Sequence, residues 1–275
     1  MRLPQTTEER LERVRDNLAR FPNLPRFREP LPDRPELAVI VGYGPSLHDT
    51  WPEIAEAQRS GAVVFTTSGA HDFLIERGVI PAFHVEMDPR EHKAFFLRNP
   101  HPDVTYCLAS HCHPSMFESV AGHRVVIWHG YTDDDHFRQD DLLARIEPGS
   151  VLLCGGSNAG LRCVVVARHY GHCHFALHGI DCSYREETLW AGKHSGERHC
   201  TVKVRCNGKI FSTSDIMMSA TDEFLDQMLW MPDTSFYVAG DGLLAERLEV
   251  LRADPARALL STKWWEPVDF VLRVA

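Results

Sequence analysis

The chain has 275 residues, of which 44% are hydrophobic and 24% are charged, and its formal net charge is −9. This composition is typical of a soluble globular protein that is large enough to bury a substantial core. Acidic and basic residues are interspersed, which argues against nucleic acid as a partner but is compatible with a local basic pocket for a small anion. No apolar run approaches the length of a membrane span.

The first residues and the cysteines indicate the compartment. The stretch 1–21 is charged and has no apolar core, so it does not have the pattern of a secretory signal. The eight cysteines are scattered without a CxxC pair, which favours reduced thiols. We therefore expect a cytoplasmic protein.

Residues 1–35 are expected to form a helix followed by an extended connector. Thr6 and Glu9 have the spacing of a capping box, and apolar residues from Leu11 to Phe21 recur at helical spacing. The connector, 21–35, contains five prolines, which remove amide donors and restrict the preceding residues. The helix could pack on the core or form a contact in a homo-oligomer, and the sequence leaves both open.

Residues 36–185 alternate between apolar strands and helices. The expected strands are 36–42, 62–68, 82–88, 104–110, 124–130, 150–156 and 172–181, and the expected helices are 50–61, 70–78, 91–99, 115–122 and 157–171. Near-continuous apolar strands separated by helices indicate a parallel sheet covered on both faces. With right-handed crossovers, this pattern predicts an α/β, Rossmann-like, doubly wound nucleotide-binding core.

Residues 186–275 are expected to form a lid, a hairpin and helices that pack on this core. The stretch 182–200 is polar and irregular, as an active-site lid would be. Residues 201–214 predict a hairpin with Asn207-Gly208 in a type I′ turn. The sequence also predicts a helix over 214–231, a strand over 235–241 and a helix over 242–252.

A glycine-rich turn follows the first strand, where an open parallel sheet binds its ligands. It consists of Gly42, Gly44, Pro45, Ser46 and Leu47. The glycines let the backbone turn sharply and approach a ligand, and the following helix would direct its positive end at an anion. The alternative is an ordinary strand-to-helix turn without a ligand.

A second turn of the same kind comprises Gly155, Gly156, Ser157 and Asn158. Ser157 stands where a helix N-cap is expected, and Asn158 adds a side-chain amide. A serine cap is common in purely structural helices. Two glycine-serine turns at strand ends of one sheet, however, could bind one nucleotide from two sides.

Three carboxylates also fall at predicted strand ends. Strand alternation places Glu86 and Asp88 on one face, where they could hold Mg²⁺ that bridges phosphates. Asp88 could equally form a turn before Pro89. Asp181 ends a buried strand and could contact substrate or a metal, or only cap the loop.

The sixteen histidines show no paired zinc-ligand spacing, so a structural zinc site is not expected. His194 and His199 differ from the others because they lie in the polar lid, where a histidine is more often near a ligand than in a core. An imidazole there could serve as a general base or as a phosphate partner.

The segments "GYGPSL", "GVIPAFHVEMDP" and "CGGSNAGLRCVVVARHYGHCHFALHGIDCSY" resemble the MptE-like 6-hydroxymethylpterin diphosphokinase family. This family includes the motility-associated Maf proteins linked to flagellin glycosylation. The resemblance covers about 36–190, with the motifs in the expected order. A fainter similarity connects the first turn with bacterial sialyltransferases, whose Gly-x-Gly-Pro-Ser-Leu turn contacts CMP.

The resemblance implies roles for particular residues. The first turn, from Gly42 to Leu47, and the second, Gly155 to Ser157, match the family's two glycine turns, while Asp88 and Asp181 match its aspartates. The chain departs from the pattern at Ala82, where the family often has aspartate. It departs again after Ser157, where Asn158 and Ala159 replace the usual apolar residue. The lid has no counterpart in the family pattern, which leaves the substrate open.

The expected function is a nucleotide-dependent transferase, with two alternatives to the reaction that the family implies. That reaction, which comes first, is transfer of diphosphate from ATP to a hydroxymethylpterin-like acceptor with Mg²⁺, in which positioning and charge neutralisation do most of the work. The second is a glycosyltransferase that uses a CMP-linked or other nucleotide-activated sugar. The third is a nucleotide-binding module without catalytic activity.

Overall fold

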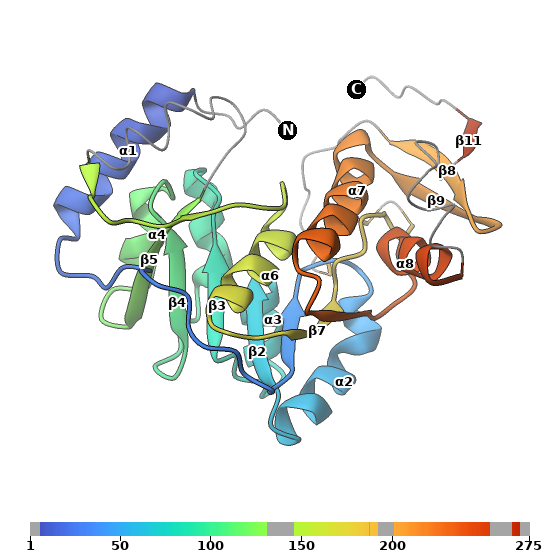
Figure 1. Ribbon diagram of the computed structural model, residues 1–275, viewed down its shortest axis with the longest axis horizontal. Helices are drawn as coiled ribbons and strands as arrows, with labels where there is room; N and C mark the ends of the chain where they lie inside the picture. Colours follow the sequence, from blue (N-terminus) through green and yellow to red (C-terminus); the bar gives the residue numbers. More distant parts are fainter. Residues whose placement is uncertain (1–5, 131–145, 187, 192–200, 254–265, 270–275) are drawn as a thin grey trace.

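The computed structural model describes residues 6–130, 146–186, 188–191, 201–253 and 266–269 (Figure 1). Its centre is an eight-stranded sheet in which every neighbouring pair is parallel. The spatial order is β10 (Ser235–Val238), β7 (His174–His178), β1 (Ala38–Val41), β2 (Val63–Thr67), β3 (Phe83–Glu86), β4 (Thr105–Ala109), β5 (Arg124–Gly130) and β6 (Leu152–Leu153). The predicted α/β, Rossmann-like architecture is confirmed.

Helices cover both faces of the sheet because its strands are apolar on both sides. Ala38 and Ile40 of β1 pack into one core cluster, together with side chains of α6 (Ala159–His169). Val39 and Val41 alternate to the other face and pack with α2 (Leu47–Arg59) and α3 (Ala70–Ile75). Strand alternation therefore divides one apolar run between two layers.

The segment after β3 differs from the sequence expectation. An α-helix was expected over 91–99, but the structure has a 3₁₀ helix, η1, over Glu91–Leu97. Lys93 N–H donates to Arg90 O at 3.2 Å, which closes the tighter i→i−3 turn. The segment lies between Pro89 and Pro100, and short 3₁₀ pieces are common in such connections. After β4, α4 (Pro114–Ser119) forms where a short helix was expected.

The N-terminal helix α1 (Thr7–Arg20) packs on the core. The predicted capping box is confirmed, because Glu9 N–H donates to Thr6 Oγ1 and Thr6 N–H donates to Glu9 Oε2. Asn17 is buried and its amide donates to Ser110 O at 2.8 Å and to Cys112 O at 2.9 Å. These bonds place α1 beside α4 and β5, on the left of Figure 1.

The C-terminal part forms a second layer of elements on the right of Figure 1. They are α7 (Asp215–Trp230), α8 (Leu243–Ala253) and a three-stranded sheet of β11 (Glu266–Asp269), β8 (Val202–Cys206) and β9 (Lys209–Thr213). Asn207 and Gly208, with φ of 49° and 78°, join β8 to β9, so the predicted hairpin turn is confirmed. The main sheet also takes its edge strand β10 from this part of the chain.

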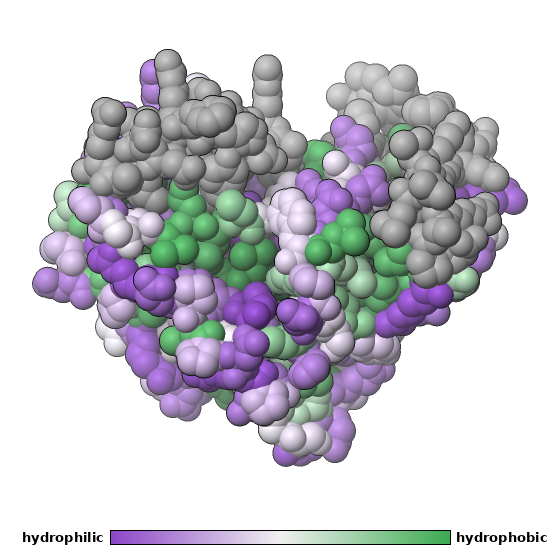
Figure 2. Space-filling view, viewed as in Figure 1, coloured by the Kyte–Doolittle hydropathy of each residue, from purple (hydrophilic) through white to green (hydrophobic). Residues whose placement is uncertain are grey.

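The surface is mixed in character. Figure 2 shows hydrophilic side chains along the lower part of the molecule and two separate hydrophobic areas at mid-height. Within the described ranges, no helix is both long and apolar enough to cross a membrane.

Candidate functional site

The strand order creates a switch point beside β1. From β1 the chain runs outward through β2 to β6 on one side, and it then returns to place β7 on the other side of β1. The loops that follow β1 and β7 therefore separate, and such a point is where open α/β sheets bind ligands. The sequence predicted a parallel sheet, but only the strand order places the switch point between these two strands.

An open cleft with about 670 Å³ of free space, part of it open to solvent, lies at this switch point. Four segments line it: the ends of β1, β2 and β7, and the beginning of α6. Leu189, Trp190 and Met217 complete the lining. Of the predicted site residues, the cleft brings together Gly42, Gly44, Asn158 and Asp181.

The first glycine turn is built against the end of β7. Gly42 N–H donates to His178 O at 2.8 Å, and Gly44 N–H donates to Gly179 O at 2.7 Å. A Cβ atom on Gly42 would lie 2.6 Å from Gly179 O, so only glycine fits. The glycines thus serve close packing of the two strand ends as well as the backbone turn.

The amino terminus of α2 is capped by the protein itself. Ser46 N–H donates to Asp181 Oδ2 at 3.0 Å, so a carboxylate occupies the place that the sequence suggested for a ligand anion. Pro45, Ser46 and Leu47 are buried and do not line the cleft. Burial raises the pKa of Asp181, and the hydrogen bonds from Ser46 oppose that rise. Asp181 therefore positions the first turn.

The second glycine turn packs against α7. The N-cap of α6 is Asn158, whose side chain accepts from Leu161 N–H at 2.8 Å; the expectation that Ser157 is the cap was wrong. Ser157 N–H instead donates to Glu223 Oε2 of α7 at 2.6 Å. The cap lies one residue later because Gly155 and Gly156, with φ of 106° and 72°, extend the turn. These two glycines and Ser157 do not line the cleft.

Glu86 and Asp88 are each engaged by neighbouring side chains. Arg90 pairs with Asp88 at 2.6 Å, and Lys93 Nζ lies 3.9 Å from the same carboxylate. Burial alone would raise the pKa of Asp88, but the hydrogen bonds from Arg90 and the charges of both cations lower it below its ordinary value. Glu86 is 1% exposed, and Ser68 N–H donates to it at 2.9 Å. Burial raises the pKa of Glu86 to about 7. Mg²⁺ would have to displace Arg90 from Asp88, and its binding here stays a prediction.

Ser68 is a cleft residue that the sequence analysis did not identify. Its φ is 53°, in the left-handed region, and Cys182, which also lines the cleft, has φ of 52°. Strained non-glycine backbone of this kind is concentrated at functional sites. Ser68 Oγ also lies 3.2 Å from Glu86 Oε1. The sequence did contain a signal, because Ser68 and Gly69 follow a predicted strand, just as the two glycine turns with their serines do.

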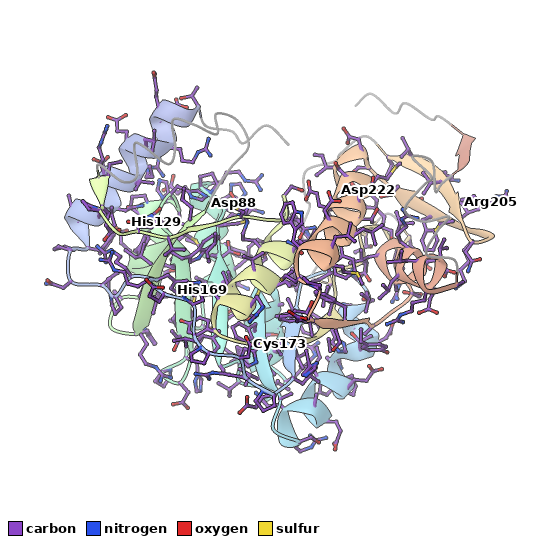
Figure 3. The ribbon with its side chains drawn as sticks, in the orientation of Figure 1. Asp88, His129, His169, Cys173, Arg205 and Asp222 are labelled. Atoms are coloured by element: carbon purple, nitrogen blue, oxygen red, sulfur yellow. The ribbon has the colours of Figure 1, made fainter. Side chains whose placement is uncertain are left out.

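In the described part of the chain, no histidine lines the cleft. His194 and His199 lie outside the described residues. Figure 3 shows His169 and Cys173 toward the lower edge of the sheet, whereas Asp88 and His129 lie at the upper edge, where the strands end. In the part of the chain that the structure describes, there is no group of three His, Cys, Asp or Glu side chains able to hold a metal ion.

Comparison with known proteins assigns the family. The model of the 6-hydroxymethylpterin diphosphokinase MptE-like family matches residues 11–187, which is more than half of the chain. The chain therefore belongs to this family. No curated protein sequence matches it significantly.

Two solved structures are similar to the chain. The Maf glycosyltransferase from Magnetospirillum magneticum AMB-1 superposes with a TM-score of 0.60 at 16% identity, over 94% of this chain and 42% of that one. The chain thus spans less than half of that protein's length, and the likeness is one of fold. A mammalian sialyltransferase in complex with Gal-beta-1-3GalNAc-ortho-nitrophenol has a TM-score of 0.40 at 13% identity, covering 86% and 87% of the two chains.

Proposed function

We propose that the protein transfers a group from a nucleotide donor that lies in the switch-point cleft. The observation that carries the proposal is the convergence of three strand ends and the start of α6 on one cleft. Asn158, Ala159 and Gly160 line it, so the positive end of an 11-residue helix favours a phosphate there. Membership of the MptE-like family supports a transferase.

The donor that fits this site best is a nucleotide-activated sugar with CMP as its nucleotide. The carboxylates at the strand ends are already engaged, since Asp88 pairs with Arg90 and Asp181 accepts from Ser46 N–H. A CMP-sugar carries one phosphate, so it needs less charge neutralisation than the triphosphate of ATP. The likeness in fold to the Maf glycosyltransferase supports sugar transfer in general.

In this reaction an acceptor hydroxyl attacks the anomeric carbon of the sugar. The bond from that carbon to the phosphate oxygen breaks, its electron pair leaves with CMP, and the hydroxyl proton passes to a base. His194 and His199 keep the role of candidate bases that the lid sequence suggested. Asp181 is better suited to holding the first turn, because its carboxylate already accepts from Ser46 N–H.

A second candidate is transfer of diphosphate from ATP to a hydroxymethylpterin. The family match over residues 11–187 favours it. In this reaction Asp88 and Glu86 would hold Mg²⁺ in place of the Arg90 pairing of Asp88, and the ion would neutralise the charge of the phosphates. Magnesium dependence therefore distinguishes the two candidates.

Isothermal titration with CMP and with ATP, each with and without Mg²⁺, tests the proposal. Binding of CMP without a metal supports the sugar donor, whereas binding of ATP only with Mg²⁺ supports diphosphate transfer. Ala159→Phe fills the cleft and should abolish either interaction. Ala19→Phe makes the same change on the exposed side of α1 and should leave binding intact. The proposal is wrong if neither nucleotide binds, or if Ala159→Phe binds as the parent does.

A further inference from the structure

An aromatic side chain stands in the cleft without a role in the sequence analysis. Trp190 lines the cleft and is partly exposed. It follows β7 in the chain, after a polar segment. Its indole is the largest flat side chain of a lining that combines glycine and hydroxyl residues with apolar side chains such as Ile180 and Met217.

The ring of Trp190 packs against two side chains of the 3₁₀ helix η1. Lys93 Nζ lies 5.2 Å from the centroid of the ring, within the range of a cation–π contact. The ring of Phe96 stands 6.1 Å away at an interplanar angle of 81°, an edge-to-face arrangement. Both residues are buried. The tryptophan is therefore held by packed side chains and has little freedom to leave the cleft.

The backbone beside Trp190 is tied to the first glycine turn. Ala191 N–H donates to Tyr43 O at 2.9 Å, and the imidazole Nε2 of His48 hydrogen-bonds to Ala191 O. Tyr43 belongs to the turn and lines the same cleft. The position of the indole is consequently fixed relative to the strand end that forms the cleft wall.

We propose that Trp190 is the platform on which the nucleobase of the donor stacks; this rests on the proposed function. A base on the indole would direct its ribose and phosphate along the cleft toward the start of α6. Stacking between a base and an aromatic side chain contributes about 1–3 kcal/mol, a roughly 5- to 150-fold change in Kd. Because every base has a flat face, the platform accepts cytosine and adenine alike.

Titrations with CMP, ATP and ribose 5-phosphate test this role. Trp190→Ala should weaken the nucleotide that the parent binds by about tenfold or more, and it should leave ribose 5-phosphate, which has no base, unchanged. Trp190→Phe retains a ring and should lose less than Trp190→Ala. An equal loss for nucleotide and ribose 5-phosphate would show that Trp190 only supports the cleft wall, and unchanged nucleotide binding in Trp190→Ala would also overturn the proposal.

Fluorescence at saturating nucleotide gives a second measurement, which reports contact with the indole. The chain has six tryptophans, and nucleotide binding should quench the emission of Trp190. The quench should disappear in Trp190→Phe and persist in Trp230→Phe, because Trp230 is 66% exposed at the end of α7 and does not line the cleft. A quench that persists in Trp190→Phe refutes the stacking, even when the parent binds nucleotide. If the parent binds no nucleotide, the proposed function and this inference fail together.

Discussion

The buried carboxylate of Glu86 should make the stability of the protein fall as the pH rises toward neutrality. Glu86 is 1% exposed, and burial together with the charge of Asp88 raises its pKa from 4.5 to about 7. The folded protein therefore holds a proton that the unfolded chain releases between these two values. The stabilisation is complete below about pH 4.5 and is lost as the pH rises through 7.

The magnitude follows from the size of the shift. One pKa unit corresponds to about 1.4 kcal/mol, so a rise from 4.5 to about 7 represents roughly 3 kcal/mol of unfolding free energy. Glu86→Gln keeps the shape and still offers an oxygen to Ser68 N–H, but it does not ionise. The variant should match the parent near pH 4.5 and be more stable by roughly 3 kcal/mol near pH 8.

Urea unfolding of the parent and of Glu86→Gln across this pH range measures the effect. The difference between the two proteins cancels the other titrating groups, such as Asp88 with its lowered pKa. A difference that is constant between pH 4.5 and pH 8 refutes the reasoning. A difference that grows as the pH falls has the opposite sign and would indicate a stabilised carboxylate. Repeating the series with Mg²⁺ tests Glu86 as a metal ligand, because a bound cation would abolish the parent's loss of stability.

Three further substitutions, with Gly61→Ala as a control, test the packing of the first glycine turn and of α1. Gly44→Ala places a Cβ against the Asp181 carboxylate and 2.7 Å from Gly179 O, so it should destabilise the protein by about 2 kcal/mol or more. The Cβ of Gly61→Ala meets only open space, so this control should cost about 1 kcal/mol, through its positive φ alone. The urea midpoints of the two variants measure the difference. Thr6→Ala removes the cap of α1 and should cost about 1 kcal/mol, which the same titration detects. Asn17→Leu leaves two buried carbonyl oxygens unpaired and should cost about 2 kcal/mol or more, with a thermal midpoint below that of the parent; an unchanged midpoint would mean that α1 does not depend on these bonds.

The elements of the core were predictable because their signals are local. Apolar runs such as Ala38–Val41 indicate buried parallel strands by composition alone, and Asn207-Gly208 specifies its turn through two backbone conformations. The 3₁₀ form of η1 was not predictable from helical spacing, because periodicity over seven residues does not distinguish the two helix types. The cap of α6 was misplaced by one residue because the positive φ of Gly155 and Gly156 became visible only in the structure.

The candidate site was predictable only in part. The glycine turns and Asp181 could be found because small residues and a carboxylate at strand ends are unusual in sequence. Ser68 had one local signal, the strand-end pair Ser68-Gly69, but its positive φ is visible only in the structure. Nothing local distinguishes Trp190 from a tryptophan outside the cleft.

The sequence by itself determined the parallel α/β core, the capped N-terminal helix and the two glycine turns, because propensity, capping and strand patterning act over a few neighbouring residues. Only the tertiary structure decided what those turns face. In the structure Ser46 N–H donates to Asp181 and Ser157 N–H donates to Glu223, and both acceptors are far away in the chain. It also set β1 beside β7, and this long-range pairing forms the cleft. Such contacts depend on strand order and on the packing of distant segments, which no local pattern encodes.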